Sequence, residues 1–161
     1  RNLLPGIFKP ILFKNIYLPR LLPMGKRSTA RRVAMQVLFQ MDAGQTDLKQ
    51  TLDLTLETDD FIEETKAFTQ KLCEGTWQHI PEIDALITQY AQGWSLERID
   101  SVDKAILRLA FYEMLYEKEV PNVAINEALD LAKKFCSPES PKFINGILGN
   151  WVKVSAREKS A

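Results

Sequence analysis

Four cationic side chains stand at the start of a segment with helical periodicity. They are Lys26, Arg27, Arg31 and Arg32, in the stretch MGKRSTARRVAMQVLFQ (24–40). Cations are unfavourable at a helix start, because the helix macrodipole is positive there. Free backbone N–H groups and converging guanidinium and ammonium groups are, however, well suited to anions such as RNA phosphates. The pattern allows two interpretations, a phosphate-binding site and a frayed, solvated basic end.

The charge of the chain is unevenly distributed. The 161 residues include 21 Lys and Arg and 21 Asp and Glu, so the formal net charge is zero. Residues 1–23 hold four cations and no acid, which leaves 17 cations against 21 acids in residues 24–161. Because this larger part is mildly acidic, it has no general attraction for nucleic acid, and any basic site on it must be local.

The residue types that enzymes use are sparse. His79 is the only imidazole, and it lies near a predicted helix end, where we expect it to cap carbonyl groups. Cys73 and Cys136 are expected to be buried thiols, and two Cys with one His form no familiar zinc motif. The glycines are scattered and form no phosphate-binding loop. We therefore expect a cytoplasmic binding protein that has no catalytic residues, metal or cofactor.

The first 23 residues differ from the rest of the chain. Prolines at positions 5, 10 and 19 exclude one long membrane-spanning helix, and a signal-peptide cleavage pattern is absent. Met24 has the character of a natural start. We expect residues 1–23 to be an N-terminal extension, disordered or non-native, and residues 24–161 to form the functional domain.

The elements that must position the cations are predicted to be helices throughout, because apolar residues recur at helical spacing and no segment has a convincing strand pattern. About seven helices are expected, with short connections, in an all-α bundle. Their predicted limits come from capping and breaking residues: Ser28 or Thr29 to Gly44, Thr46 to about Leu56, Asp59 to His79, Pro81 to Tyr90, Asp100 to about Glu117, Pro121 to Phe135, and a last helix from Ser140.

Two of these helices have well-defined apolar faces. The first places Arg31 at the flank of its apolar face and Arg32 opposite to it. The residues expected inside are Ala30, Val33, Ala34, Val37, Leu38 and Met41 in the first helix, and Val102, Ala105, Ile106, Leu109, Ala110 and Tyr112 in the long one.

Three blocks of the sequence resemble the NusB family of bacterial transcription antitermination factors. They are ARRVAMQVLFQ (30–40), DKAILRLAFYEM (103–114) and VAINEALDLAKKF followed by PKFINGILG (123–149). The resemblance extends from about residue 26 to residue 151, and residues 1–23 have no counterpart in it. It implies two packed three-helix bundles without enzymatic activity.

The same resemblance implies a partner and a ligand. The family binds the boxA element, a single-stranded RNA of nascent ribosomal RNA leaders. It binds as a heterodimer with NusE, which is also a small-subunit ribosomal protein. The pair helps to build an antitermination complex on RNA polymerase.

Residues of this chain match the positions that the family uses to bind RNA and to bind its partner. The basic start matches at Lys26, Arg27 and Arg31, although Ser28 and Thr29 stand where some members have further arginines. The other matching positions are, for RNA, Arg108, Glu139, Lys142 and Phe143, and, for the partner, Phe39 and Asp103.

Three of these residues have a plain structural alternative. Asp103 and Arg108 are spaced to form a surface pair within one helix, and Phe143 is equally suited to the core. The function has alternatives as well. One is an RNA-recruiting module like that of certain ribosomal RNA cytosine methyltransferases, which carry a catalytic domain after the helical one. The other is a helical scaffold or homodimer whose basic end is incidental.

Overall fold

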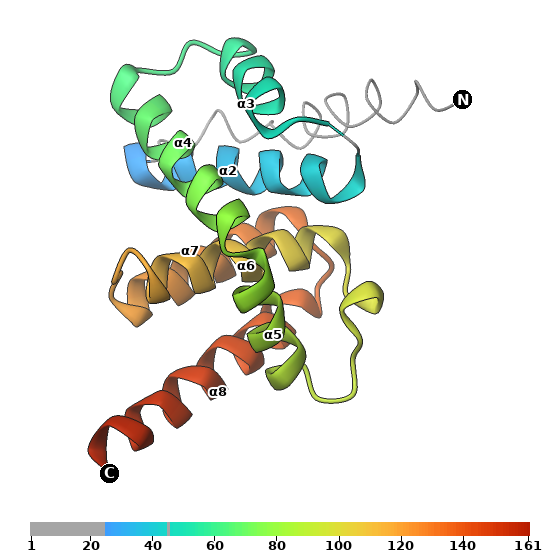
Figure 1. The fold of residues 1–161 in the computed structure, drawn as a ribbon, viewed down its shortest axis with the longest axis vertical. Helices are drawn as coiled ribbons and strands as arrows, with labels where there is room; N and C mark the ends of the chain where they lie inside the picture. Colours follow the sequence, from blue (N-terminus) through green and yellow to red (C-terminus); the bar gives the residue numbers. More distant parts are fainter. Residues whose placement is uncertain (1–24, 45) are drawn as a thin grey trace.

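The computed structural model describes residues 25–44 and 46–161 (Figure 1), so the expectation for residues 1–23 lies outside the described residues. This part of the chain is all-helical, as predicted, with seven α-helices and one short 3₁₀ helix. They are α2 (Lys26–Ala43), α3 (Leu48–Glu57), α4 (Glu63–Gln78), α5 (Ile80–Tyr90), η2 (Leu96–Arg98), α6 (Ser101–Leu115), α7 (Pro121–Phe135) and α8 (Ser140–Ser160).

The helices form the two packed bundles that were predicted. Helices α2, α3 and α4 make the first bundle, and α6, α7 and α8 make the second, with α5 packed on α6 and α8. The bundles are joined chiefly by α2 lying against α6. The C-terminal half of α8 projects away from the rest of the molecule (Figure 1).

Helix α6 is the centre of the molecule. Every residue from Asp103 to Met114 is buried, whereas the sequence predicts a single apolar face. The difference arises because α2, α4, α5, α7 and α8 all pack around α6, and a helix enclosed on every side has no solvated face. Its charged residues must therefore find partners inside the protein.

Several predicted helix ends are confirmed. The apolar face of α2 is buried as expected, and α2 ends before Gly44. Asp100 caps α6 by accepting a hydrogen bond from the backbone N of Val102 at 3.0 Å. Pro81 lies in the first turn of α5, where its missing N–H costs nothing. Helix α8 continues without a break through Asn145 and Gly146.

Other predicted starts are wrong. The N-cap of α2 is Gly25, with no side-chain cap, and Asp47 instead of Thr46 caps α3 by accepting from the N of Gln50 at 3.1 Å. Helix α4 begins at Glu63, four residues later than predicted from Asp59, with Glu63 and Glu64 favourably placed at the positive end of its dipole. The residues before it stay outside the helix.

Packing between α4 and α6 depends on Gly75. The ring of Tyr112 occupies the space that a Cβ at this position would need, so the glycine allows close approach of the two helices. The C-cap of α4 is His79, whose Nδ1 lies 2.8 Å from the carbonyl oxygen of Gly75, as expected for a histidine at a helix end. Both cysteines are free; Cys73 is buried and Cys136 half-buried. In the described residues, no helix combines the length and apolar character that crossing a membrane requires.

Candidate nucleic-acid interface

The first two cations of α2 are exposed and weakly paired. Lys26 Nζ lies 3.0 Å from Glu64 Oε2, and both side chains are well exposed. The Arg27 guanidinium lies 3.9 Å from the centre of the Phe68 ring and 3.5 Å from Glu119 Oε2. The exposed pair of Lys26 and Glu64 contributes little to stability, and Glu119 keeps its contact with Arg31 if Arg27 turns to another anion, so a phosphate can replace both carboxylates at low cost. Lys26 and Arg27 are available to an anion in this conformation.

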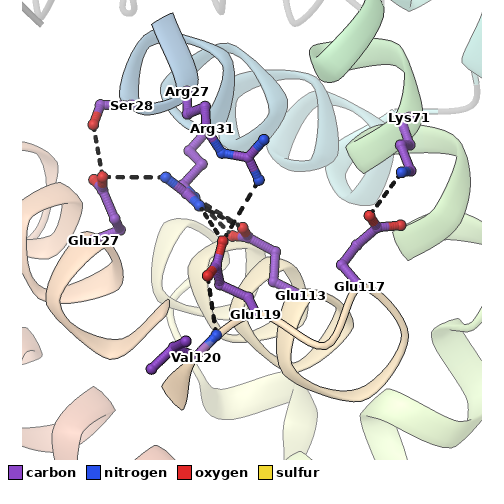
Figure 2. A network of polar contacts seen from close by, with 9 residues as sticks. All are labelled: Arg27, Ser28, Arg31, Lys71, Glu113, Glu117, Glu119, Val120 and Glu127. Carbon is purple, nitrogen blue, oxygen red and sulfur yellow. Dashed lines mark hydrogen bonds and ion pairs between the residues drawn. The ribbon is translucent and has the colours of Figure 1, made fainter. Parts of the chain in front are cut away.

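Arg31, in contrast, is enclosed by carboxylates (Figure 2). Its side chain is 3% exposed, and its Nε lies 2.9 and 3.0 Å from the two oxygens of Glu113. It also lies 3.2 Å from Glu119 and 3.1 Å from Glu127, while Ser28 Oγ donates to Glu127 at 2.6 Å. The sequence placed Arg31 at the flank of the apolar face of this helix, and the fold covers that flank with carboxylates.

The charges of this cluster act on the pKa values of its members. Burial alone would lower the pKa of Arg31, but the hydrogen bond and charge of Glu113, with Glu127 and Glu119, raise it. Desolvation raises the pKa of Glu113 above that of an ordinary carboxyl group. The cationic start of α2 is thus balanced by acids from α6, α7 and the segment between them. Arg31 joins the two bundles and positions Arg27 beside it.

A second ion-pair cluster lies at the opposite end of α2 and α6. Arg108 binds both oxygens of Asp84 at 2.8 Å, through Nε and Nη2, and donates through Nη1 to Asp42 at 2.9 Å. Lys104 Nζ donates to the other oxygen of Asp42 at 3.1 Å. Arg108 is 5% exposed, so the expected surface position is wrong, and so is the alternative pair with Asp103. Instead, Arg108 crosslinks α2, α5 and α6.

Asp103 is also buried, at 6% exposure, although it was expected at the surface. Its Oδ2 accepts a hydrogen bond of 2.9 Å from Ser140 Oγ, which in turn lies 3.0 Å from Ser137 Oγ. Desolvation raises the pKa of Asp103, despite the hydrogen bonds from Cys136 and Ser140. Ser140 is consequently not a helix cap; it fixes the start of α8 beside the start of α6.

The start of α8 carries three predicted site residues. Glu139 is the N-cap residue of α8 without a side-chain cap, and Lys142 and Phe143 follow in the first turn. All three line a cavity of about 410 Å³ between the end of α5, the following loop and α8. Phe143 is half-buried and packs against the core, which supports the core alternative and leaves part of its ring exposed. Phe39 on α2 is half-buried and also packs against the core.

The predicted site residues form two groups rather than one. Arg31 near the start of α2 pairs with Glu113 near the end of α6, whereas Asp42 near the end of α2 pairs with Arg108. The two helices are therefore antiparallel, and Arg31 and Asp42 are about 16 Å apart along α2 at 1.5 Å per residue. Lys26 and Arg27 belong to the first end. Glu139, Lys142 and Phe143 belong to the other end.

Two residues at or beside the cavity near the start of α8, Trp94 and Arg98, were not predicted from the sequence. Trp94 is 49% exposed, its ring meets that of Phe143 edge-on with centroids 5.9 Å apart, and Arg98 lies 5.6 Å from its centre. These residues lie in the loop between α5 and α6, where no periodicity marks them. An aromatic residue followed by a cation four positions later, outside any long helix, was the one available sign.

Most of the chain matches a known protein family. The family model described as the NusB family matches residues 28–153. The transcription antitermination protein NusB of Symbiobacterium thermophilum is 46% identical over 136 residues, covering 79% of this chain and 89% of that protein.

Two solved structures are similar to the fold. The NusB of T. maritima superposes with a TM-score of 0.72 at 36% identity, covering 82% of this chain and 93% of that one. A chain from a crystal structure of the antitermination factors NusB and NusE in complex with dsRNA superposes with a TM-score of 0.75 at 27% identity. That match covers 82% of this chain and 99% of the other.

Proposed function

The chain belongs to the NusB family, and on this premise we propose that it is a transcription antitermination factor that binds boxA-type RNA together with NusE. In this proposal the RNA is the single-stranded leader of a ribosomal RNA transcript, and the heterodimer joins an antitermination complex on RNA polymerase. The observation that carries the proposal is that two exposed cations, Lys26 and Arg27, lie beside the buried ion pairs of Arg31.

The first contact is at the start of α2. Lys26 is paired with the exposed carboxylate of Glu64, and Arg27 makes one long contact with Glu119, which Arg31 also binds. Phosphate competes with these carboxylates for the donors of Lys26 and Arg27. Arg31 keeps its partners and acts by holding the start of α2 in place. Arginine at the position of Arg27 can bind a phosphate bidentately or stack on a base.

The second contact is at the start of α8. Lys142 supplies a cation, Phe143 an aromatic surface and Glu139 an anion that opposes phosphate. Asp103 and Arg108 act here through position: the first holds Ser140, and the second fixes α6 against α2 and α5. Phe39 and the start of α6 form the proposed contact with NusE.

The experiment is a fluorescence-anisotropy titration of labelled boxA RNA and of a scrambled RNA of the same composition. We expect the protein to bind boxA RNA more tightly than the scrambled RNA, and NusE to increase that preference. Equal affinity for both RNAs in the presence of NusE would contradict the proposal. The salt dependence of each affinity separates phosphate contacts from base contacts.

A further inference from the structure

Trp94 is the only tryptophan among the large apolar side chains that are exposed in the described residues. It lies in the loop that follows α5, 49% exposed, although Phe143 and Arg98 both contact its ring system. A ligand that covers the exposed part of the indole gains about 25 cal/mol of free energy for each Å² of apolar surface that it removes from water. The ring is therefore held in position by its neighbours while much of its surface stays open to a ligand.

The space beside Trp94 is a cavity with an open wall. Six of its residues are Tyr90, Gln92, Trp94, Lys142, Phe143 and Asn150. Gly146 also lines it, and a Cβ added there would meet no atom within 4 Å. The cavity stays accessible because this turn of α8 has no side chain to fill it.

The chemistry of the lining selects the kind of ligand. Aromatic rings stack on planar groups, and Gln92 and Asn150 offer amide donors and acceptors to the edge of such a group. Lys142 and Arg98 place positive charge at the border, which suits a phosphodiester attached to the planar group. Glu139 opposes any anion, the phosphodiester included, so the planar group must supply most of the attraction and an acidic peptide is disfavoured. An unpaired nucleobase within a strand satisfies all of these requirements.

We propose that the cavity between Trp94, Phe143 and Lys142 is a stacking subsite for one unpaired base of the bound RNA. The inference rests on the proposed RNA-binding function and adds Trp94 and Arg98 to its residues. Stacking on an aromatic side chain tolerates any base, because every base has a π face. The subsite therefore contributes affinity at one fixed nucleotide position without choosing its identity.

The test combines protein variants with RNAs that lack one base. Wild type and Trp94→Ala are titrated with boxA RNA and with a series in which each nucleotide in turn is abasic. We expect Trp94→Ala to weaken binding of intact RNA about fivefold or more, with an unchanged salt slope. At one position, loss of the base should weaken wild type but leave Trp94→Ala unaffected. Trp94→Phe should recover most of the affinity.

A second variant probes the cavity without touching the tryptophan. Gly146→Leu adds a side chain into the open wall and improves helix propensity, so thermal stability should hold or rise. RNA affinity should nevertheless fall, whereas Gly146→Ala, which adds only a Cβ, should bind as wild type does. Leu54→Ala, at an exposed leucine in the other bundle, controls for loss of apolar surface.

The possible outcomes separate the two proposals. RNA binding by the wild type with no effect of Trp94→Ala and no abasic position coupled to it would overturn the subsite and leave the RNA-binding function standing. The same result would arise if the cavity holds a protein segment instead of a base. Failure of the wild type to bind boxA RNA, with and without NusE, would overturn the function and the subsite together.

Discussion

Arg31 and Glu113 meet across the contact between α2 and α6, with Nη2 and Oε1 2.8 Å apart and both side chains 3% exposed. Buried charges of this kind are stable only as a set, because removing one leaves the others desolvated without a partner. Arg31 therefore has a structural role, although it belongs to the basic start of α2. It also gives a sharp way to separate the roles of two neighbouring arginines.

We expect Arg31→Ala to lower the free energy of unfolding by about 3–5 kcal/mol, since Glu113 and its neighbours lose their counter-charge. Arg27→Ala should change it by no more than about 0.5 kcal/mol, because the Arg27 side chain is exposed and Glu119 keeps Arg31 as a partner. Urea unfolding followed by circular dichroism measures both. Equal effects of the two substitutions would show that the cluster is not the tie between the bundles.

Lys26 and Arg27 should act on RNA through charge. Neutralising either one is expected to weaken binding of every RNA sequence and to reduce the log–log salt slope by about 0.7. Helicity should hold or rise slightly, because a cation is removed from the positive end of α2. Lys49→Ala is the matched control, an exposed first-turn lysine of α3 paired with Asp53. A double variant of Lys26 and Arg27 that binds as tightly as wild type would remove α2 from the interface.

Glu139→Gln is expected to tighten RNA binding, because an anion near phosphates repels them. The gain should be largest at low salt, where screening is weakest. Stability should fall only slightly, through loss of a negative charge beside the start of α8. Titrations at two salt concentrations and thermal melts measure both effects, with Glu57→Gln in the other bundle as the charge control. A clear loss of melting temperature without tighter binding would assign Glu139 to the helix alone.

Asp103 and Ser140 should be energetically coupled. Asp103→Ala is expected to cost about 1–3 kcal/mol of stability, because it removes a buried hydrogen bond and leaves Ser140 with Ser137 as its remaining side-chain partner. In a double-mutant cycle, Ser140→Ala should then add little. Binding of NusE by the same variants tests the partner contact. If Asp103→Ala binds NusE no worse than Ser140→Ala does, Asp103 has no role there beyond position.

Asp42 should make the protein sensitive to acid. Desolvation raises its pKa, but the hydrogen bonds from Arg108 and Lys104 outweigh that effect and hold the pKa below its usual range. A carboxyl group with a lowered folded-state pKa stabilises the fold above its unfolded pKa, near 4, and loses that contribution as the pH falls through the folded value. The stability difference between wild type and Asp42→Asn should therefore shrink from pH 7 to pH 3. A constant difference in urea unfolding over this range would contradict the assignment.

Local patterns were sufficient to predict the helices and much of the core. The apolar spacing of α2, the Asp100 cap and the Pro81 start depend on residues within one or two turns of each other. The partners of Arg31 lie 82 to 96 residues away, and no window of sequence contains both ends of those contacts. A helical wheel therefore placed Arg31 at the border of the surface and could not show the carboxylates that cover it.

The positions of the candidate site residues were predictable from the sequence only in part. Lys26, Arg27 and Lys142 are exposed in the first turns of their helices, as their positions in the sequence predict. Asp103 and Arg108 were misjudged because α6 is enclosed on every side, which one apolar face in the sequence does not indicate. Trp94 was missed because loop residues gain their surroundings only from tertiary structure.

The antiparallel packing of α2 and α6 also sets a distance on the surface of the protein. Buried ion pairs join the two helices at both ends, and Ser140 ties the start of α8 to α6, so the fold sets the distance between the start of α2 and the start of α8. In the proposed complex, an RNA strand that contacts Lys26 and Lys142 must span this distance with a fixed number of nucleotides. Inserting a nucleotide between the two contacts should force the strand to bulge, and deleting one should pull a contact apart.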